Sequence, residues 1–240
     1  MRNMAVIPAR GGSKRIPKKN IIDFMGKPMI AWTIEAALNS KLFDRVLVST
    51  DCMEIAQISK NYGASVPFLR NTANDDFSPV SLATCAALQQ SIELLDEHYD
   101  IITQLMPNTP LRTSQDIIDA TANFLERKAP SQISCFKFGW MNPWWAVKLD
   151  AAMKPVPIFS EIQNKRSQDF PPLYCPTGAI WITQVDKLLE HRTFYCPDHI
   201  YYPMEWFSAV DIDDNDDLSM ARAVFMMRNQ ISPELQGKKN

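Results

Sequence analysis

Five cationic side chains lie between positions 10 and 19, in a segment that contains no acidic residue. They are Arg10, Lys14, Arg15, Lys18 and Lys19. Two adjacent glycines, Gly11 and Gly12, can expose backbone N–H groups and let an anion approach the main chain closely. The segment follows the apolar run 4–7, a predicted strand, and open α/β sheets bind ligands at the carboxyl ends of their strands. Because the net charge of the whole chain is only −2, this concentration of positive charge predicts a polyphosphate-binding loop over residues 7–20.

The predicted loop matches neither of the two common phosphate motifs. No Gly-x-x-x-x-Gly-Lys-Ser/Thr sequence occurs, since Gly26-Lys27 is followed by Pro28, and no Gly-x-Gly-x-x-Gly occurs anywhere in the chain. A solvated basic turn is the alternative for any such cluster of Lys and Arg. Proline at positions 8 and 17 stiffens both ends of the loop, and together with the two glycines this favours a defined phosphate site.

Two carboxylates near the other end of the chain form a second candidate site. Asp211 and Asp213 flank Ile212, and on an extended strand the alternation of side chains would direct both carboxylates to one face. Two acidic oxygens on one face suit a hard cation such as Mg²⁺, which takes one or two carboxylates together with substrate phosphate. The alternative is that this acidic segment caps the helix that follows it and interacts with the helix dipole.

The phosphate loop carries a resemblance to a known family. Residues 7–20 and the continuation Phe24-Met25-Gly26-Lys27-Pro28-Met29-Ile30 resemble the N-terminal signature of the acylneuraminate cytidylyltransferases. Members of this family are CMP-sugar synthetases that activate sialic acid and related nine-carbon acid sugars with CTP. The resemblance implies a Mg²⁺-assisted enzyme in which the anomeric hydroxyl of the sugar attacks the α-phosphorus of CTP in line and releases pyrophosphate. A nucleotidyltransferase of the Kdo or uridylyl type, or a nucleotide-binding protein without turnover, is the alternative.

The resemblance also implies roles for individual residues. Contacts to the nucleotide are expected from Arg10, Gly11, Gly12, Ser13, Lys14, Lys19 and Asn20, and from Arg70, which resembles a nucleotide-contacting arginine of the family. The expected Mg²⁺ ligands are Asp211 and Asp213. The expected catalytic residues are Arg10, Lys19 and Asp211.

Two further segments resemble the parts of the family that hold the sugar. Residues 103–112 resemble the Leu-Gln-Pro-Thr-Ser-Pro-Leu-Arg element, but two residues separate Gln104 from Pro107 where the family usually has none. Either Gln104 or Asn108 could therefore supply the sugar-facing amide. Residues 166–171 resemble the Arg-Gln-Asp-Leu-Pro element in a form, Arg-Ser-Gln-Asp, that is frequent in the branch handling pseudaminic acid. Because a sugar carboxylate favours a bidentate cation, this segment adds three substrate-binding candidates: Lys165, Arg166 and Gln168.

The apolar patterns alternate between strands and helices, which predicts one α/β domain over residues 1–240. The fold expected is a Rossmann-like, mostly parallel sheet with helices on both faces. Strands are predicted at 4–7, 46–50, 65–70, 100–106, 132–138, 178–182 and 208–213, and helices at 28–40, 53–61, 79–97, 114–127, 185–190 and 216–229. Residues 139–175 are rich in Trp and Pro, which predicts extended segments or a hairpin projecting from the main sheet. In the resembled family this region is an arm that swaps into a dimer partner, so a homodimer is expected; a local core within one monomer is the alternative.

Composition excludes several other classes of protein. The small net charge and a pI of about 5.9 argue against a nucleic-acid-binding protein. No apolar run approaches the roughly 20 residues that span a bilayer, and the N-terminus shows no signal peptide, so a cytoplasmic location without membrane contact is expected. Five cysteines without a Cys-x-x-Cys motif indicate neither a zinc ribbon nor a disulfide framework.

Overall fold

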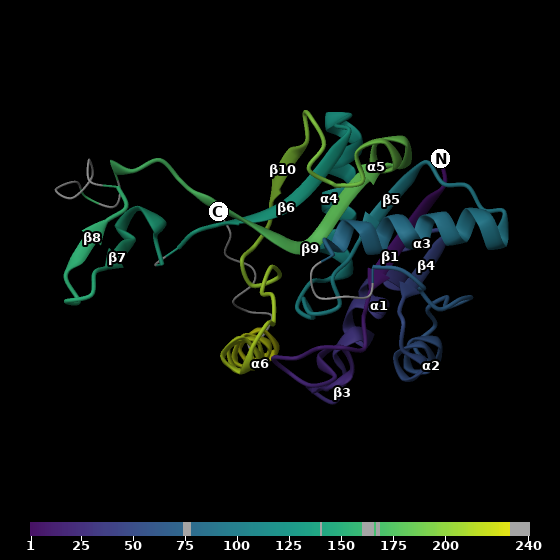
Figure 1. Ribbon diagram of the computed structural model, residues 1–240, viewed down its shortest axis with the longest axis horizontal. Coiled ribbons are helices and arrows are strands. Elements are labelled where there is room, and N and C mark those ends of the chain that lie inside the picture. Colours follow the sequence, from purple (N-terminus) through teal and green to yellow (C-terminus); the bar gives the residue numbers. More distant parts are fainter. Residues whose placement is uncertain (74–77, 140, 160–165, 167–168, 231–240) are drawn as a thin grey trace.

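A six-stranded sheet forms the centre of the computed structural model (Figure 1), which describes residues 1–73, 78–139, 141–159, 166 and 169–230. The strand order is β10-β6-β9-β5-β1-β4. The strands are β1 (Asn3–Pro8), β4 (Arg45–Ser49), β5 (Ile101–Gln104), β6 (Ser131–Lys137), β9 (Tyr174–Gln184) and β10 (Ile200–Pro203). β9 runs antiparallel to both of its neighbours, and the other pairs are parallel. The predicted mostly parallel α/β sheet is therefore confirmed.

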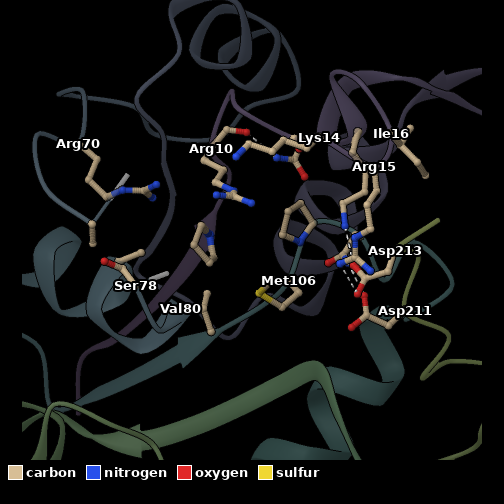
Figure 2. Close-up of a pocket in the computed structure, with 18 residues that line it drawn as sticks. Arg10, Lys14, Arg15, Ile16, Arg70, Ser78, Val80, Met106, Asp211 and Asp213 are labelled. Carbon is tan, nitrogen blue, oxygen red and sulfur yellow. Dashed lines mark hydrogen bonds and ion pairs between the residues drawn. The ribbon is translucent and has the colours of Figure 1, made fainter. Parts of the chain in front are cut away.

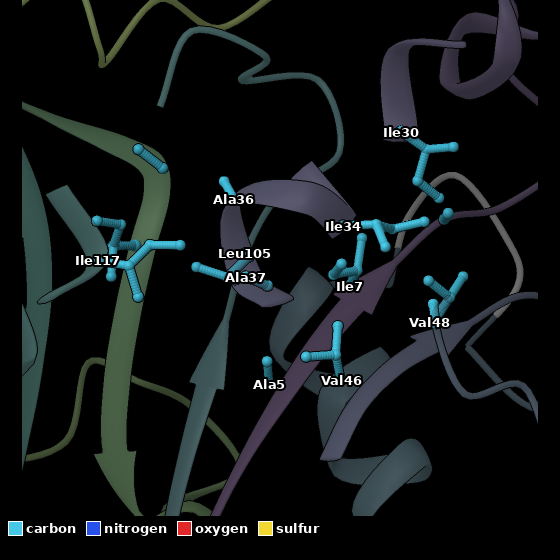
Figure 3. Packing of buried hydrophobic residues seen from close by; sticks show 14 of the residues in the cluster. Ala5, Ile7, Ile30, Ile34, Ala36, Ala37, Val46, Val48, Leu105 and Ile117 are labelled. Atoms are coloured by element: carbon cyan, nitrogen blue, oxygen red, sulfur yellow. The ribbon is translucent and has the colours of Figure 1, made fainter. Parts of the chain in front are cut away.

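Helices cover both faces of the sheet, and as a result β1 is buried on both sides. Ala5 and Ile7 belong to one apolar cluster, whereas Met4 and Val6 belong to another, as the alternation of side chains along a strand requires. The helices are α1 (Met29–Ser40), α2 (Met53–Asn61), α3 (Val80–Leu95), α4 (Ser114–Arg127), α5 (Val185–His191) and α6 (Asn215–Gln230). Figure 3 shows the first cluster, in which Ile34 of α1 lies over β1 and β4. The second cluster is completed by residues of α3 and α5.

The predicted strand at 65–70 is wrong. Ser65 forms a single parallel bridge with Leu47, and further along only the backbone N–H of Arg70 reaches the extension of β4, donating to the Thr50 carbonyl at 2.7 Å. Pro67 explains the interruption, because proline has no N–H to donate to a ladder. The segment therefore follows the sheet edge without becoming a strand, and it still brings Arg70 beside the end of β4.

The predicted strand at 208–213 is also wrong. The segment begins with turns and continues as an irregular loop, and the backbone N–H of Ile212 donates to the carbonyl of Asn108 at 2.9 Å rather than to a strand. The alternation nevertheless holds locally, because Ile212 is fully buried between two aspartates that both line the same cavity. We call residues 210–213 the aspartate loop.

Two local details add to this fold. α4 spans the predicted residues, and its N-cap is Thr113, whose hydroxyl accepts from the Asp116 N–H at 3.1 Å while the Asp116 carboxylate accepts from the Thr113 N–H at 2.8 Å. This reciprocal pair is a capping box. A two-stranded hairpin, β2 (Asp23–Phe24) and β3 (Lys27–Pro28), follows the phosphate loop and the short helix η1 (Lys19–Ile21).

The predicted hairpin within residues 139–175 is confirmed. β7 (Val147–Leu149) pairs antiparallel with β8 (Pro155–Pro157), preceded by the short helix η2 (Pro143–Trp145). The hairpin lies between β6 and β9 in the chain, and it projects far from the sheet, at the left of Figure 1. We call residues 139–173 the arm. Among the described residues, no helix combines the length and the apolar character that crossing a membrane requires.

Candidate functional site

A cavity of about 330 Å³ opens at the carboxyl ends of β1 and β5. The phosphate loop forms one wall, the aspartate loop faces it, and the start of α3 and the turn after β5 complete the lining (Figure 2). Nine predicted site residues line it: Arg10, Ser13, Lys14, Lys19, Asn20, Arg70, Asn108, Asp211 and Asp213. Segments nearly 200 positions apart thus meet in one site, with cations on one side and carboxylates on the other.

The phosphate loop is held from behind by groups that do not depend on a ligand. The backbone N–H of Gly11 donates to Asp51 Oδ1 at 2.8 Å, and Asn20, which is buried, donates through Nδ2 to the Arg10 carbonyl at 2.9 Å. A Cβ atom at Gly11 would lie 3.0 Å from Cys52 Cβ, so a larger residue there would have to displace the start of α2 or the loop by a few tenths of an ångström. A Cβ at Gly12 would meet nothing within 4 Å. Neither glycine is among the cavity-lining residues.

Two arginines extend into the same side of the cavity. The guanidinium of Arg70 points toward that of Arg10 across the opening in Figure 2. Arg70 is 4% exposed, and its Nη1 donates to the Ser49 carbonyl at 2.8 Å. Burial lowers the pKa of Arg70; the Asp51 carboxylate opposes this shift and the Arg10 charge adds to it. A bound anion would relieve the repulsion between these two cations.

The aspartate loop is tied to the phosphate loop through Asp213. Lys19 Nζ donates to Asp213 Oδ1 at 2.8 Å and to the Ile212 carbonyl at 2.9 Å, and Arg15 Nη2 lies 2.9 Å from Asp213 Oδ2. Burial opposes ionisation of this carboxyl, but the hydrogen bonds and charges of Lys19 and Arg15 outweigh it, so the pKa of Asp213 is lowered. Asp213 is therefore a carboxylate with a cation at each oxygen.

Asp211 has the opposite electrostatic character. The residue as a whole is exposed to solvent, but protein atoms pack around its carboxyl group. This burial, together with the charge of Asp213, raises the pKa of Asp211 to about 6, and the more distant cations Lys19 and Arg15 offset only part of the effect. Asp211 is thus the carboxylate of the pair whose charge lacks compensation, and an added cation would stabilise its ionised form.

The aspartate pair can supply two ligands to a hard cation, and water or substrate oxygens would complete its coordination shell. Among the described residues, no group of three or more His, Cys, Asp or Glu side chains gathers as a ready-made metal site. Two carboxylates at the edge of a cavity fit Mg²⁺, which commonly keeps several waters and binds through one or two carboxylates and phosphate. The donor set therefore fits the Mg²⁺ expected from the sequence.

The two amide candidates for sugar contact are placed differently. Gln104 on β5 is fully buried, accepts from Thr84 Oγ1 at 2.6 Å through Oε1, and does not line the cavity. Asn108 lines the cavity from the turn after β5, and its Nδ2 donates to the Asp211 carboxylate and to the Ile212 carbonyl. The extra residues 105 and 106 carry the chain from the strand to that turn.

Of the three candidates on the arm, the structure describes Arg166. Arg166 is exposed and forms a bidentate pair with Asp169, with Nε and Nη2 at 2.9 and 3.1 Å from the two carboxylate oxygens. Arg166 is not a lining residue of the cavity. The candidates Lys165 and Gln168 lie outside the described residues.

Several residues of the site were not predicted from the sequence. Arg15 belongs to the cationic cluster, but its spacing predicts no particular role. The only sequence signal for Asp51 is its position directly after a predicted strand. Met106 lines the cavity and packs so closely on Gly178 of β9 that a Cβ there would lie 2.7 Å from Met106 Cγ. Ser78, another lining residue, gave no signal in the sequence.

Comparison with known proteins agrees with this geometry. The pattern of the family described as cytidylyltransferase matches residues 4–169. A pseudaminic acid cytidylyltransferase of Campylobacter jejuni subsp. jejuni serotype O:23/36 (strain 81-176) is 34% identical, over 96% of this chain and 99% of its own. A CMP-N,N'-diacetyllegionaminic acid synthase of Legionella pneumophila is 33% identical over 81% of this chain and 83% of its own.

A solved structure supports the fold independently. A CMP:2-keto-3-deoxy-manno-octonic acid synthetase in complex with CTP superposes with a TM-score of 0.66 at 20% identity, covering 95% of this chain and 100% of that one. With the sequence matches to the family and its members, these observations lead to one conclusion: the chain belongs to the cytidylyltransferase family.

Proposed function

We propose that this protein activates a nine-carbon acid sugar with CTP, giving the CMP-sugar and pyrophosphate. The observation that carries the proposal is the cavity in which the cationic phosphate loop faces the Asp211–Asp213 pair. A triphosphate suits the cations, and the carboxylates suit the cation that accompanies it. Membership in the cytidylyltransferase family and the names of the relatives agree with CTP and with an acid sugar.

The reaction needs positioning and charge neutralisation more than a protein nucleophile. The anomeric hydroxyl oxygen forms a bond to the α-phosphorus, while the bond from that phosphorus to the bridging oxygen of the pyrophosphate breaks. Arg10, Lys14 and Ser13, which line the cavity, hold the triphosphate and offset the charge on the leaving pyrophosphate. The Gly11 N–H, in contrast, is occupied by Asp51. Asn20 keeps the loop in shape through its hydrogen bond to the Arg10 carbonyl. Arg70 contacts the nucleotide beside Arg10.

Asp211 and Asp213 hold Mg²⁺ in this proposal. The ion, when bound, supplies a positive charge near the α-phosphate. Lys19 belongs to both halves of the site, because it lies in the phosphate loop and its Nζ donates to the aspartate loop. A movement of one half is therefore transmitted to the other through this side chain.

We further propose a homodimer whose arms reach the partner's cavity and bring Lys165, Arg166 and Gln168 to the sugar. Exposed apolar surface on the arm supports this, since such surface on a projecting element marks an interface. Seven side chains there are between 48% and 71% exposed: Met141, Trp145, Val147, Leu149, Met153, Val156 and Ile158. A local aromatic group around Trp144, which packs on Phe159 with ring centroids 4.9 Å apart, stiffens the arm without covering this surface.

A pseudaminic-type acid is the first substrate to test. The chain carries Arg-Ser-Gln-Asp at residues 166–169, and the relative that matches nearly the full length of both chains is named for pseudaminic acid. A cytoplasmic location agrees with a reaction that consumes CTP.

Pyrophosphate release tests the whole proposal. CTP, UTP, ATP and GTP are each supplied with Mg²⁺ and with pseudaminic, legionaminic, N-acetylneuraminic or Kdo acid. We expect release with CTP and a nine-carbon acid, and its loss in EDTA. Release with UTP, or with Kdo alone, would overturn the assignment of nucleotide or sugar. Binding of CTP by the folded protein without any turnover across the panel would favour a nucleotide-binding protein.

Replacement of Asp211 by Ala tests the metal role separately. We expect turnover to fall at least about 100-fold, because a direct metal ligand is lost, while CTP binding measured in EDTA stays within about twofold of wild type. Equal turnover in the variant and the wild type would remove Asp211 from the mechanism.

A further inference from the structure

The turn that follows β5 is fixed independently of the aspartate loop. The hydroxyl of Thr109 donates to the Met106 carbonyl at 2.9 Å. Nη1 of Arg112, a residue only 2% exposed, donates to Thr109 Oγ1 and to the Ala179 carbonyl of β9, each at 2.7 Å. The turn therefore presents Asn108 from a rigid support.

Asn108 attaches the aspartate loop to this support through both its side chain and its main chain. Its Nδ2 donates to Asp211 Oδ1 and to the Ile212 carbonyl (3.0 Å), and lies 3.5 Å from Asp213 Oδ1. Its carbonyl accepts the Ile212 N–H at 2.9 Å. The aspartate loop belongs to no strand. These hydrogen bonds to Asn108 therefore fix the positions of the two carboxylates, in place of the backbone ladder of a sheet.

The amide has no N–H to offer a substrate in this arrangement. Its two hydrogens face three oxygens of the aspartate loop, and the residue is 3% exposed. The other end of the amide, Oδ1, is buried, and no described residue forms a hydrogen bond with it. Burial of an unpaired acceptor costs free energy. The donor group of Asn108 is therefore used by the aspartate loop.

We infer that Asn108 is a positioning residue that orients the Asp211–Asp213 pair for its cation, and not a sugar-contacting residue. The inference rests on the proposed function, in which the pair holds Mg²⁺. Residues behind metal ligands commonly change metal affinity or activity 10–100-fold when replaced. Asn108 stands behind the aspartate pair in the same position as such residues. Its side chain also donates a hydrogen bond to the Asp211 carboxylate.

Replacement of Asn108 by Leu, which keeps the approximate size and removes the donor, tests the inference. Binding of Mn²⁺ to the nucleotide-free protein is measured by electron paramagnetic resonance, and CTP binding is measured calorimetrically in EDTA. We expect Mn²⁺ affinity to fall about 10–100-fold, CTP affinity to stay within about twofold, and turnover to fall without a change in the KM for the sugar. Thr109→Val is the matched control, because it removes two buried hydrogen bonds of the same turn, to the Met106 carbonyl and from Arg112, neither of which reaches the carboxylates.

The outcomes separate this inference from the proposed function. Unchanged Mn²⁺ affinity with a raised KM for the sugar would overturn it and return Asn108 to the sugar site. Equal losses of Mn²⁺ affinity in Asn108→Leu and Thr109→Val would reduce Asn108 to a general structural role. Absence of Mn²⁺ binding by the wild type would overturn the metal site itself, and the inference with it. If the Leu variant does not fold, Asn108→Ser retains one donor, and we then expect a smaller loss of Mn²⁺ affinity in the same direction.

Discussion

Replacement of Lys19 by Met removes the one side chain that links the phosphate loop directly to the Ile212 carbonyl and Asp213 Oδ1. The Lys19 side chain is only 16% exposed, so its bond to the Asp213 carboxylate belongs to the charge-assisted class that contributes about 1.5–3 kcal/mol. Arg15, which holds the other oxygen of Asp213, is 65% exposed and compensates little. We therefore expect the free energy of unfolding to fall by about 1.5–3 kcal/mol.

The kinetic effect of the same change should be larger than its effect on stability. Loss of a preorganised cation beside the reacting phosphate typically costs about 10²–10³-fold in kcat, or about 3–4 kcal/mol. The assays are pyrophosphate release at saturating CTP and urea unfolding followed by circular dichroism. Lys18→Met is the matched control, since Lys18 is the preceding residue, is largely exposed, and pairs only with Glu54 at the surface. Equal kcat values for the two variants would refute this account of Lys19.

Three further predictions follow from other parts of the molecule. Gly11→Ala places a Cβ 3.0 Å from Cys52, so we expect calorimetry to show weaker CTP binding, by about 1 kcal/mol or more, with Gly12→Ala near wild type. The hydrogen bond from Arg45 lowers the pKa of Glu97, so its stabilisation is fully present above the unfolded pKa of about 4.3 and is lost as the pH falls through the lower folded pKa; Glu97→Gln should therefore cost most urea stability at pH 7 and progressively less as the pH falls below about 4.3. Val156→Asp should convert a dimer to monomers in light scattering, and an unchanged mass would contradict the proposed interface.

The sequence predicted the strands and helices correctly wherever a local pattern of residues decides the structure. The apolar run before the phosphate loop became a strand buried on both faces, and α2 spans the predicted residues 53–61. The same reasoning failed at residues 65–70 and 208–213, where an extended, apolar-containing segment lacks a complete strand partner. Strand formation depends on a neighbouring edge with free hydrogen-bonding groups, and that neighbour is decided by the tertiary fold.

The site was predicted in part for the same reason. Residues of the phosphate loop lie together because they are close in the chain, and Asp211 and Asp213 share a cavity because a buried residue separates them. The role of Asn108 depends on a contact between positions more than 100 residues apart, and Asp51 is placed by its distance from Gly11 in space. Arg166 shows the remaining limit, since it does not line the cavity of its own chain, and its proposed role depends on a contact with a second chain that the sequence of one chain does not place.

The length of β9 has a mechanical consequence. This strand covers 11 residues from the base of the arm into the middle of the sheet, but its ladder with β6 is interrupted by an irregularity at residues 177–180. At this point Gly178 packs on Met106, and Thr177 donates through its hydroxyl to the Ala209 carbonyl at 3.0 Å, just before the aspartate loop. The unpaired residues that support the cavity therefore lie on the same strand as the base of the arm, between its two paired segments. We therefore expect a contact made by the arm to affect the residues at the floor of the cavity. Variation in the length or sequence of the arm should then change the site even where the arm touches no substrate.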